Sequence, residues 1–316
     1  MPLPTDESIV ALADKILAQF DAIFGLHAGF RPAHAKGAMV TGTFTPSPQA
    51  AGLSTAAHFG RASTPVTVRF SNSTGLPLIP DNDPNANPRG MAIRFHLAER
   101  EHTDIVSHST DGFPTRTGDE FLEFLQALAT TDLSKASDPA NPSPLEKFLG
   151  SHPAALAFVQ TPKPFASSFA RETYFGVTAF GFTNRSGETR FGRYRITPNA
   201  GNDYLDPAGK SPNYIFDELQ QRIARQPIAF RLLVQLANPG DVVDDATTHW
   251  PADRPTLELG ALTLTSAAPN DAAAQKQIIF DPIPRLEGIA PSADPLLELR
   301  AAIYLISGRR RRKASA

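Results

Sequence analysis

The chain contains no cysteine among its 316 residues. That absence excludes disulfide bonds, a thiolate nucleophile and every metal site that depends on cysteine sulfur. The chain also lacks an excess of either charge, since 30 lysines and arginines stand against 32 aspartates and glutamates. A balanced charge gives no electrostatic reason to expect nucleic acid or an anionic membrane surface as a partner.

Long apolar runs are missing as well. No stretch of the sequence approaches the roughly 20 apolar residues that a membrane-spanning helix needs. Near the N-terminus, Asp6, Glu7 and Asp14 occupy the region where a secretory signal needs early positive charge and an unbroken apolar segment. We therefore expect a soluble, cytoplasmic protein without a membrane association.

Phenylalanine is what the chain has in quantity. It contains 21 Phe against 5 Tyr and 1 Trp, and 41% of its residues are apolar. Phenylalanine adds apolar area without a polar tip, so this ratio favours a large dry interior or cavity lining. Because no linker of biased composition divides the chain, we expect one domain over residues 1–316.

Hydrophobic periodicity predicts a helix near the N-terminus and strands after it. The N-terminal helix is expected over residues 6–24, with Thr5 as its N-cap. Strands are expected over 66–71, 91–96, 175–183, 189–197, 228–237, 256–266 and 277–281. Short helices are expected over 118–130, 143–150 and 213–225. This pattern predicts an α+β fold, an antiparallel β-barrel over about residues 35–285 with surrounding helices.

The last predicted helix, over residues 295–307, has clear end signals. Asp294 is expected to cap it, Pro295 to occupy its first position and Gly308 to stop it. Arg300 and Tyr304 are four residues apart and therefore share one helical face. The basic run that follows, residues 309–313, is typical of a solvated tail.

Single residues leave their roles open. Alternation over residues 66–71 places Arg69 and Ser71 on one face, and taken alone it favours a face that meets water. If that face is buried, both side chains need partners. His34 beside a strand and Tyr304 on an apolar helix face are more often structural than functional.

The order of several segments resembles that of the haem catalases. The segments are Arg31-Pro32-Ala33-His34-Ala35-Lys36-Gly37, Gly42-Thr43-Phe44-Thr45, Pro65-Val66-Thr67-Val68-Arg69-Phe70-Ser71, Asn87-Pro88-Arg89-Gly90-Met91-Ala92-Ile93-Arg94-Phe95 and Arg300-Ala301-Ala302-Ile303-Tyr304. The fourth is similar to the family's Asp-Pro-Arg-Gly segment and the fifth to its proximal Arg-x-x-x-Tyr. The likeness covers about residues 28–311. It implies a catalase-like barrel with haem b buried in it.

The resemblance also implies roles for individual residues. Tyr304 is expected to bind the haem iron as a phenolate, with Arg300 and Fe³⁺ lowering the pKa of the phenol. His34 is expected to take a proton from one peroxide oxygen and deliver it to the other, while Ser71 orients its ring. The expected partners of the haem carboxylates and the aromatic residues packed near the haem are Arg31, Arg69 and Arg311, and Phe113 and Phe121.

Two positions depart from the family pattern. His108 stands where catalases have the first asparagine of a Gly-Asn-Asn-Thr-Pro segment, which helps to position the second peroxide. Ala33 stands where they usually have a valine that narrows the channel. The chain also lacks the long N-terminal arm of larger catalases, so we expect an accessible haem and a monomer or homodimer.

These departures predict a catalase-related peroxidase that oxidises small organic donors with H₂O₂ or organic hydroperoxides and keeps residual catalase activity. One alternative is a minimal catalase in which His108 or a water replaces the asparagine. Another is an isomerase or dehydratase of fatty-acid hydroperoxides, although such relatives have threonine at the position of Ala33. A haem carrier without enzyme activity would have no use for His34 together with Arg300 and Tyr304.

Overall fold

The alternating segments close into a barrel. A computed structural model describes residues 2–132 and 134–314. In it eight antiparallel strands follow one another in the order β10–β11–β1–β2–β3–β4–β6–β8, and β10 pairs with β8 to complete the ring. These strands are β1 (Gly37–Pro46), β2 (Thr64–Ser71), β3 (Gly90–Ala98), β4 (Glu101–His108), β6 (Tyr174–Phe175), β8 (Thr189–Pro198), β10 (Ile228–Leu236) and β11 (Thr256–Ala267).

Four short strands lie outside the ring. They are β7 (Phe180–Thr183) and β12 (Ile289–Pro291), which extend the sheet beyond β8, and β5 (Phe165–Ala166) and β9 (Tyr204–Leu205), which pair with each other. The predicted antiparallel barrel is therefore confirmed.

Apolar side chains fill the inside of the barrel. Val68, Phe70, Ile93, Phe95 and Phe230 are fully buried there and belong to one continuous cluster. Because side chains alternate along a strand, the residues between them face away from this interior. The outer face of β2, β3 and β4 is thereby free to form the wall of a separate site.

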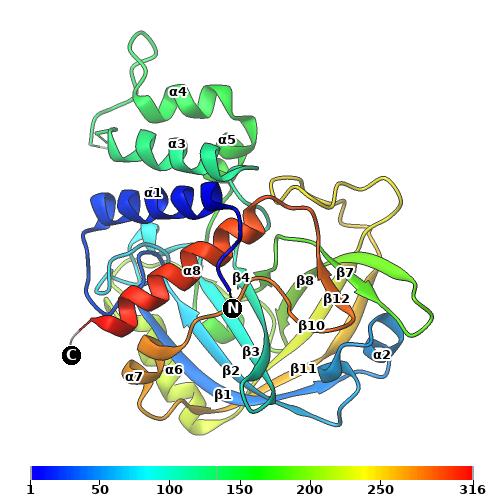
Figure 1. The fold of residues 1–316 in the computed structure, drawn as a ribbon. Coiled ribbons are helices and arrows are strands. Elements are labelled where there is room, and N and C mark those ends of the chain that lie inside the picture. The colour runs from blue at the N-terminus through cyan, green and yellow to red at the C-terminus, as the bar shows by residue number, and fades with distance from the viewer. Residues whose placement is uncertain (1, 133, 315–316) are drawn as a thin grey trace.

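In the described part of the chain, helices surround the barrel. They are α1 (Glu7–Phe24), α2 (Ala50–Leu53), α3 (Gly118–Ala129), α4 (Pro144–Ser151), α5 (Pro153–Gln160), α6 (Tyr214–Arg225), α7 (Asp271–Gln277) and α8 (Leu296–Lys313). α8 crosses the barrel strands with α1 beside it, and α3, α4 and α5 stack beyond α1 (Figure 1). Among the described residues, none of these helices combines the length and apolarity that crossing a membrane requires.

Both terminal helices differ from the prediction at their ends. Asp6, not Thr5, caps α1, because its Oδ1 accepts the backbone N–H of Ser8 at 2.8 Å. α8 begins at Leu296 with Pro295, not Asp294, at the N-cap position, although Asp294 Oδ1 accepts the N–H of Leu296 at 2.9 Å. Gly308 does not end α8: a Cβ at this position would lie 2.4 Å from Ile279, so the glycine allows a close approach inside the helix.

The segment predicted as a strand over residues 277–281 is another correction. α7 ends at Gln277, and the residues after it form no ladder; arginine side chains donate instead to the carbonyl oxygens of Ile278 and Ile279. The predicted strand over 175–183 is broken between β6 and β7, where Thr178 turns toward Arg300. β4 and α5 were not predicted. The ends of the predicted domain, residue 1 and residues 315–316, lie outside the described residues.

Candidate active site

Strand register gathers the predicted distal residues. Across β2, β3 and β4, Ser71 pairs with Gly90 and Gly90 pairs with His108. A Cβ on Gly90 would lie 2.5 Å from the Ser71 Oγ and 2.8 Å from the His34 Nδ1. The glycine therefore leaves the space into which the ring of His34 fits, next to Ser71.

His34 reaches this place through an unusual backbone. Its φ of 55° lies in the left-handed region, and the next residue is fixed by a hydrogen bond from Ala35 N–H to Thr74 O at 3.0 Å. The Nδ1 of His34 lies 3.1 Å from the Ser71 Oγ, as predicted. One edge of the ring borders a cavity, but protein surrounds the rest. Burial, reinforced by the positive charge of Arg69, lowers the pKa of His34 to about 4.

His108 lies on the last residue of β4 and borders the same cavity. Burial is the main cause that lowers its pKa to about 3, and His34, Arg300 and Lys163 add to the shift. Its Nδ1 accepts the backbone N–H of Thr110 at 3.3 Å. In the neutral ring the proton therefore lies on Nε2, so His108 is a hydrogen-bond donor at that atom.

The predicted proximal pair lies on α8. Arg300 donates from Nη2 to the phenol oxygen of Tyr304 at 3.4 Å and from Nη1 to the Thr178 Oγ at 3.2 Å. Burial lowers the pKa of Arg300, but Tyr304 and Asp294 outweigh it and the pKa is raised. Arg300 therefore places a permanent positive charge beside the phenol.

Arg31, Arg69 and Arg311 form a second cluster, which we call the arginine cluster. Arg69 and Arg311 are each 3% exposed. The prediction that this face of β2 meets water is therefore wrong, and so is the prediction that the basic run is fully solvated. Burial is the main cause that lowers the pKa of Arg69 to about 9 and of Arg311 to about 10. Within the described ranges, none of the three forms an ion pair with a carboxylate.

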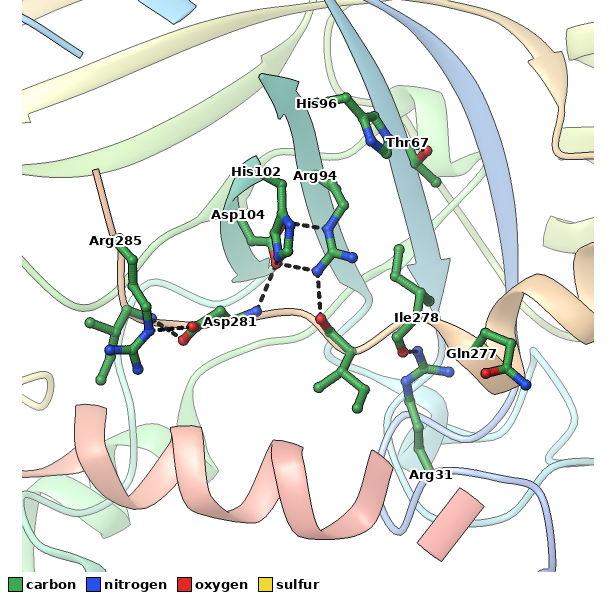
Figure 2. Close-up of polar contacts among 12 residues, drawn as sticks. Arg31, Thr67, Arg94, His96, His102, Asp104, Gln277, Ile278, Asp281 and Arg285 are labelled. Atoms are coloured by element: carbon green, nitrogen blue, oxygen red, sulfur yellow. Dashed lines mark hydrogen bonds and ion pairs between the residues drawn. The ribbon is translucent and has the colours of Figure 1, made fainter. Parts of the chain in front are cut away.

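Arg69 donates to the side chain of Gln275 and to the carbonyl oxygens of His34 and Ala35, whereas the other two arginines share a carbonyl just after α7. Arg31 and Arg311 both donate to the carbonyl oxygen of Ile278, at 3.2 and 2.6 Å (Figure 2 shows the first contact). Carbonyl groups orient a guanidinium without cancelling its charge. The cluster therefore keeps a surplus of positive charge.

An ion-pair network fixes the same segment from the barrel side. Arg94 forms two hydrogen bonds with Asp104, at 2.9 and 2.7 Å, and also donates to Ile279 O. Asp104 Oδ2 accepts the backbone N–H of Asp281 at 2.7 Å (Figure 2). These contacts tie residues 278–281 to β3 and β4, so the carbonyls that hold the arginine cluster have fixed positions.

The residues predicted from the sequence to form the site border one cavity of about 880 Å³. Tyr304 and Arg300 border the cavity from α8. His34, Ser71 and His108 border it from the barrel side, and the arginine cluster lies where the barrel side meets α8. The predicted aromatic pair also meets there: the rings of Phe113 and Phe121 are 5.3 Å apart. The cavity lies between the outer face of the barrel wall and helices α1, α3 and α8.

The fold and cavity define a β-barrel protein with a deep site for a large group that carries negative charge. The catalase family model matches residues 12–315, nearly the whole chain. The chain belongs to the catalase family, haem oxidoreductases that act on H₂O₂.

Relatives at about one-third identity include two catalase-related peroxidases. The chain is 31% identical over 297 residues to the catalase-related peroxidase of Synechococcus elongatus, and the match covers 93% of this chain and 87% of the relative. It is 32% identical over 292 residues to that of Mycolicibacterium paratuberculosis, covering 90% of this chain and 89% of the relative. A Vibrio vulnificus catalase is 28% identical over 295 residues, covering 87% of this chain but 56% of the catalase.

Solved catalases share the fold. A fungal catalase superposes with a TM-score of 0.77 at 24% identity, covering 98% of this chain and 64% of its own. Catalase A from Saccharomyces cerevisiae superposes with a TM-score of 0.76 at 22% sequence identity, and the match covers 98% of this chain and 65% of that catalase. The chain thus spans about two-thirds of these larger catalases.

The residues around the cavity fit the haem that the family implies. The buried arginine cluster has no carboxylate partner in the described part of the chain, and haem brings two carboxylates. Tyr304 offers an oxygen ligand of the kind that haem iron takes in catalase. The remaining wall is largely apolar, as a porphyrin face requires.

Two residues at the cavity were not singled out from the sequence. Asn87 and Lys163 both border it, on the side of α5. Asn87 stands where the family segment begins with aspartate, and that difference was the available signal. Nothing in the sequence around Lys163 marks it, because the contact between residue 163 and the cavity depends on the turn after α5.

Proposed function

We propose that the chain is a haem-dependent peroxidase on a catalase core. It oxidises small organic donors with H₂O₂ or organic hydroperoxides and keeps residual dismutation of H₂O₂. The observation that carries this proposal is the cavity of about 880 Å³, whose apolar wall continues past His108 to α3 and α5. Haem accounts for part of this lining; beyond it, hydrogen peroxide needs no apolar wall, whereas an organic donor does.

Haem b, bound through the phenolate of Tyr304, supplies the redox chemistry when present. Arg300 stabilises that phenolate, because its guanidinium already donates to the phenol oxygen at 3.4 Å. The arginine cluster binds the haem carboxylates, and these pairs offset the cost of its buried charge. The position of these residues around one cavity supports these roles.

His34 moves the proton. Its Nδ1 is held by Ser71 Oγ at 3.1 Å, which leaves Nε2 as the proton acceptor. With a pKa of about 4, the ring is neutral at pH 7 and ready to act as a base. Nε2 takes the proton from one peroxide oxygen and returns it to the other, so that the bond between the oxygens breaks heterolytically.

His108 distinguishes this site from that of a typical catalase. It offers one N–H at Nε2 where an asparagine side chain offers an amide. Its ring is bulkier than the asparagine side chain and borders the same cavity as His34. A second peroxide is therefore positioned less favourably, and an organic donor competes. In a minimal catalase the same N–H replaces the asparagine, so it also favours that enzyme as the second candidate.

Two rates separate the candidates. The protein is purified with haem supplied during expression, and oxygen release is compared with oxidation of an aromatic donor at matched H₂O₂. We expect donor oxidation to exceed oxygen release, and His34→Ala to lower both together by about 10²–10⁴-fold. Rapid oxygen release with little donor oxidation would show a minimal catalase. Conversion of an organic hydroperoxide without any donor would show an isomerase or dehydratase.

A further inference from the structure

Exposed apolar side chains gather on two loops. Among the described residues seven large apolar side chains are exposed, and four of them lie either in the loop after α1 or in the loop after β2. These four, which we call the apolar patch, are Leu26, Phe30, Leu76 and Leu78. Leu26 is 70% exposed and Leu78 is 90% exposed. Single exposed apolar residues are common on protein surfaces, but a concentration of them marks an interaction site.

Contacts between the two loops hold the patch together. The backbone N–H of Ala35 donates to the carbonyl oxygen of Thr74 at 3.0 Å. A Cβ on Gly75 would lie 2.9 Å from the side chain of Phe24 and even closer to the carbonyl oxygen of Pro32. The backbone beside Leu76 therefore lies against the segment that carries Leu26 and Phe30.

The C-terminal end of α8 lies beside these loops. Arg310 forms an ion pair with Asp21, which is in the last turn of α1. Arg31 directly follows Phe30 in the chain and shares a carbonyl oxygen just after α7 with Arg311. The C-terminal ends of α1 and α8 also lie on the same side of the molecule (Figure 1). The basic last turn of α8 therefore flanks the apolar patch.

This part of the surface has an excess of positive charge. Arg309, Arg312 and Lys313 are exposed, and within residues 2–132 and 134–314 no carboxylate pairs with them. Residues 25–30 and 73–79 contain no aspartate or glutamate. The charge of the whole chain is balanced, so the excess is local and is not apparent from the composition.

Exposed leucines next to arginine and lysine match the surface of an anionic bilayer. Apolar side chains enter the boundary between headgroups and acyl chains, while basic side chains pair with the lipid phosphates. A second copy of this chain fits less well, because the same face of the partner would bring a like positive charge to the contact.

We propose that the apolar patch and the basic end of α8 dock the protein on the surface of an anionic lipid membrane. Leu26 and Leu78 enter the headgroup region, and Arg309 and Lys313 pair with phosphates. No helix has to cross the bilayer for this attachment. Leu76 borders the cavity of the active site as well, so docking brings this end of the cavity next to the bilayer.

Vesicle flotation of the haem-loaded protein tests the docking. One set of vesicles contains phosphatidylcholine alone, and the other an equimolar mixture of phosphatidylcholine and phosphatidylglycerol. We expect the mixture to bind the protein at least about tenfold more tightly, and added salt to weaken this binding. Equal binding to both sets of vesicles, or to neither, would overturn the proposal.

Two double variants separate the contributions of charge and apolar area. Arg309→Gln with Lys313→Gln should weaken binding to the mixed vesicles about 25-fold, because each basic residue near an anionic surface contributes about fivefold. Leu26→Gln with Leu78→Gln should weaken it at least about tenfold, because the leucines no longer enter the bilayer. Unchanged binding of the leucine variant would show adsorption by charge alone and would overturn the docking mode.

Matched control variants change the same residue types elsewhere. Arg185→Gln with Arg190→Gln removes two exposed arginines from the hairpin of β7 and β8, and Val242→Gln changes an exposed apolar residue between β10 and β11. Both should bind the mixed vesicles as the wild type does. Analytical ultracentrifugation tests the other occupant. A dimer that Leu78→Gln abolishes, together with no binding to vesicles, would assign the patch to self-association and would also overturn the proposal.

Discussion

The burial of His34 determines how the reaction with peroxide depends on pH. Its pKa is lowered to about 4, from 6.5 for a solvated histidine. We expect the second-order rate constant for H₂O₂ to be flat from pH 8 to about pH 5 and to halve near pH 4. A solvated histidine at pH 5 would be only about 3% neutral, so the two cases differ roughly thirtyfold there.

Stopped-flow absorbance of the haem band, recorded on mixing with H₂O₂, measures this rate constant. The fold also loses stability as pH falls from 6.5 toward about 4, because the unfolded chain protonates His34 first, so circular dichroism must accompany each point. His34→Gln should remove the step, whereas His96→Gln, a change on the outer surface of β3, should preserve it. A midpoint near pH 6.5 would refute the burial argument.

Two further substitutions test the site. Tyr304→Phe should abolish stable haem binding or displace the haem absorbance band when the protein is reconstituted with haem. Tyr204→Phe, a change at an exposed tyrosine, is the control. An unchanged band in the Tyr304 variant would exclude Tyr304 as the iron ligand. Gly90→Ala should slow the reaction with peroxide at least about tenfold at unchanged haem content, because its Cβ would lie 2.8 Å from the His34 Nδ1. Gly150→Ala, with open space around its Cβ, should have no such effect, and equal rates for both would contradict the steric argument.

The barrel strands and α1 were predictable because they depend on local periodicity, as in the alternation of β2 and β3. α8 was predicted from its end signals, and Asp294 and Pro295 placed its start one residue early. The site was predictable only through the order of motifs along the chain. Alternation alone places Arg69 and Ser71 on one face but contains no information about whether helices cover that face.

The remaining errors concern contacts between distant segments. Gly308 has the local signature of a helix end, and its role depends on Ile279, which approaches α8 from another part of the chain. Residues 277–281 have strand composition, but Arg31 and Arg311 take carbonyl oxygens in this segment. Neither of these contacts can be predicted from the residues that neighbour Gly308 or residues 277–281 in the sequence.

The positions of the site residues along the chain have a consequence for biosynthesis. One wall comes from residues near His34 and Ser71, and the other from α8, more than 200 residues later. A nascent chain grows from its N-terminus, so the barrel wall emerges long before Tyr304 and Arg311 are made. Haem therefore cannot serve as a template during early translation. Its insertion is a late event of maturation, and between the synthesis of α8 and that event the three positive charges of the arginine cluster repel one another.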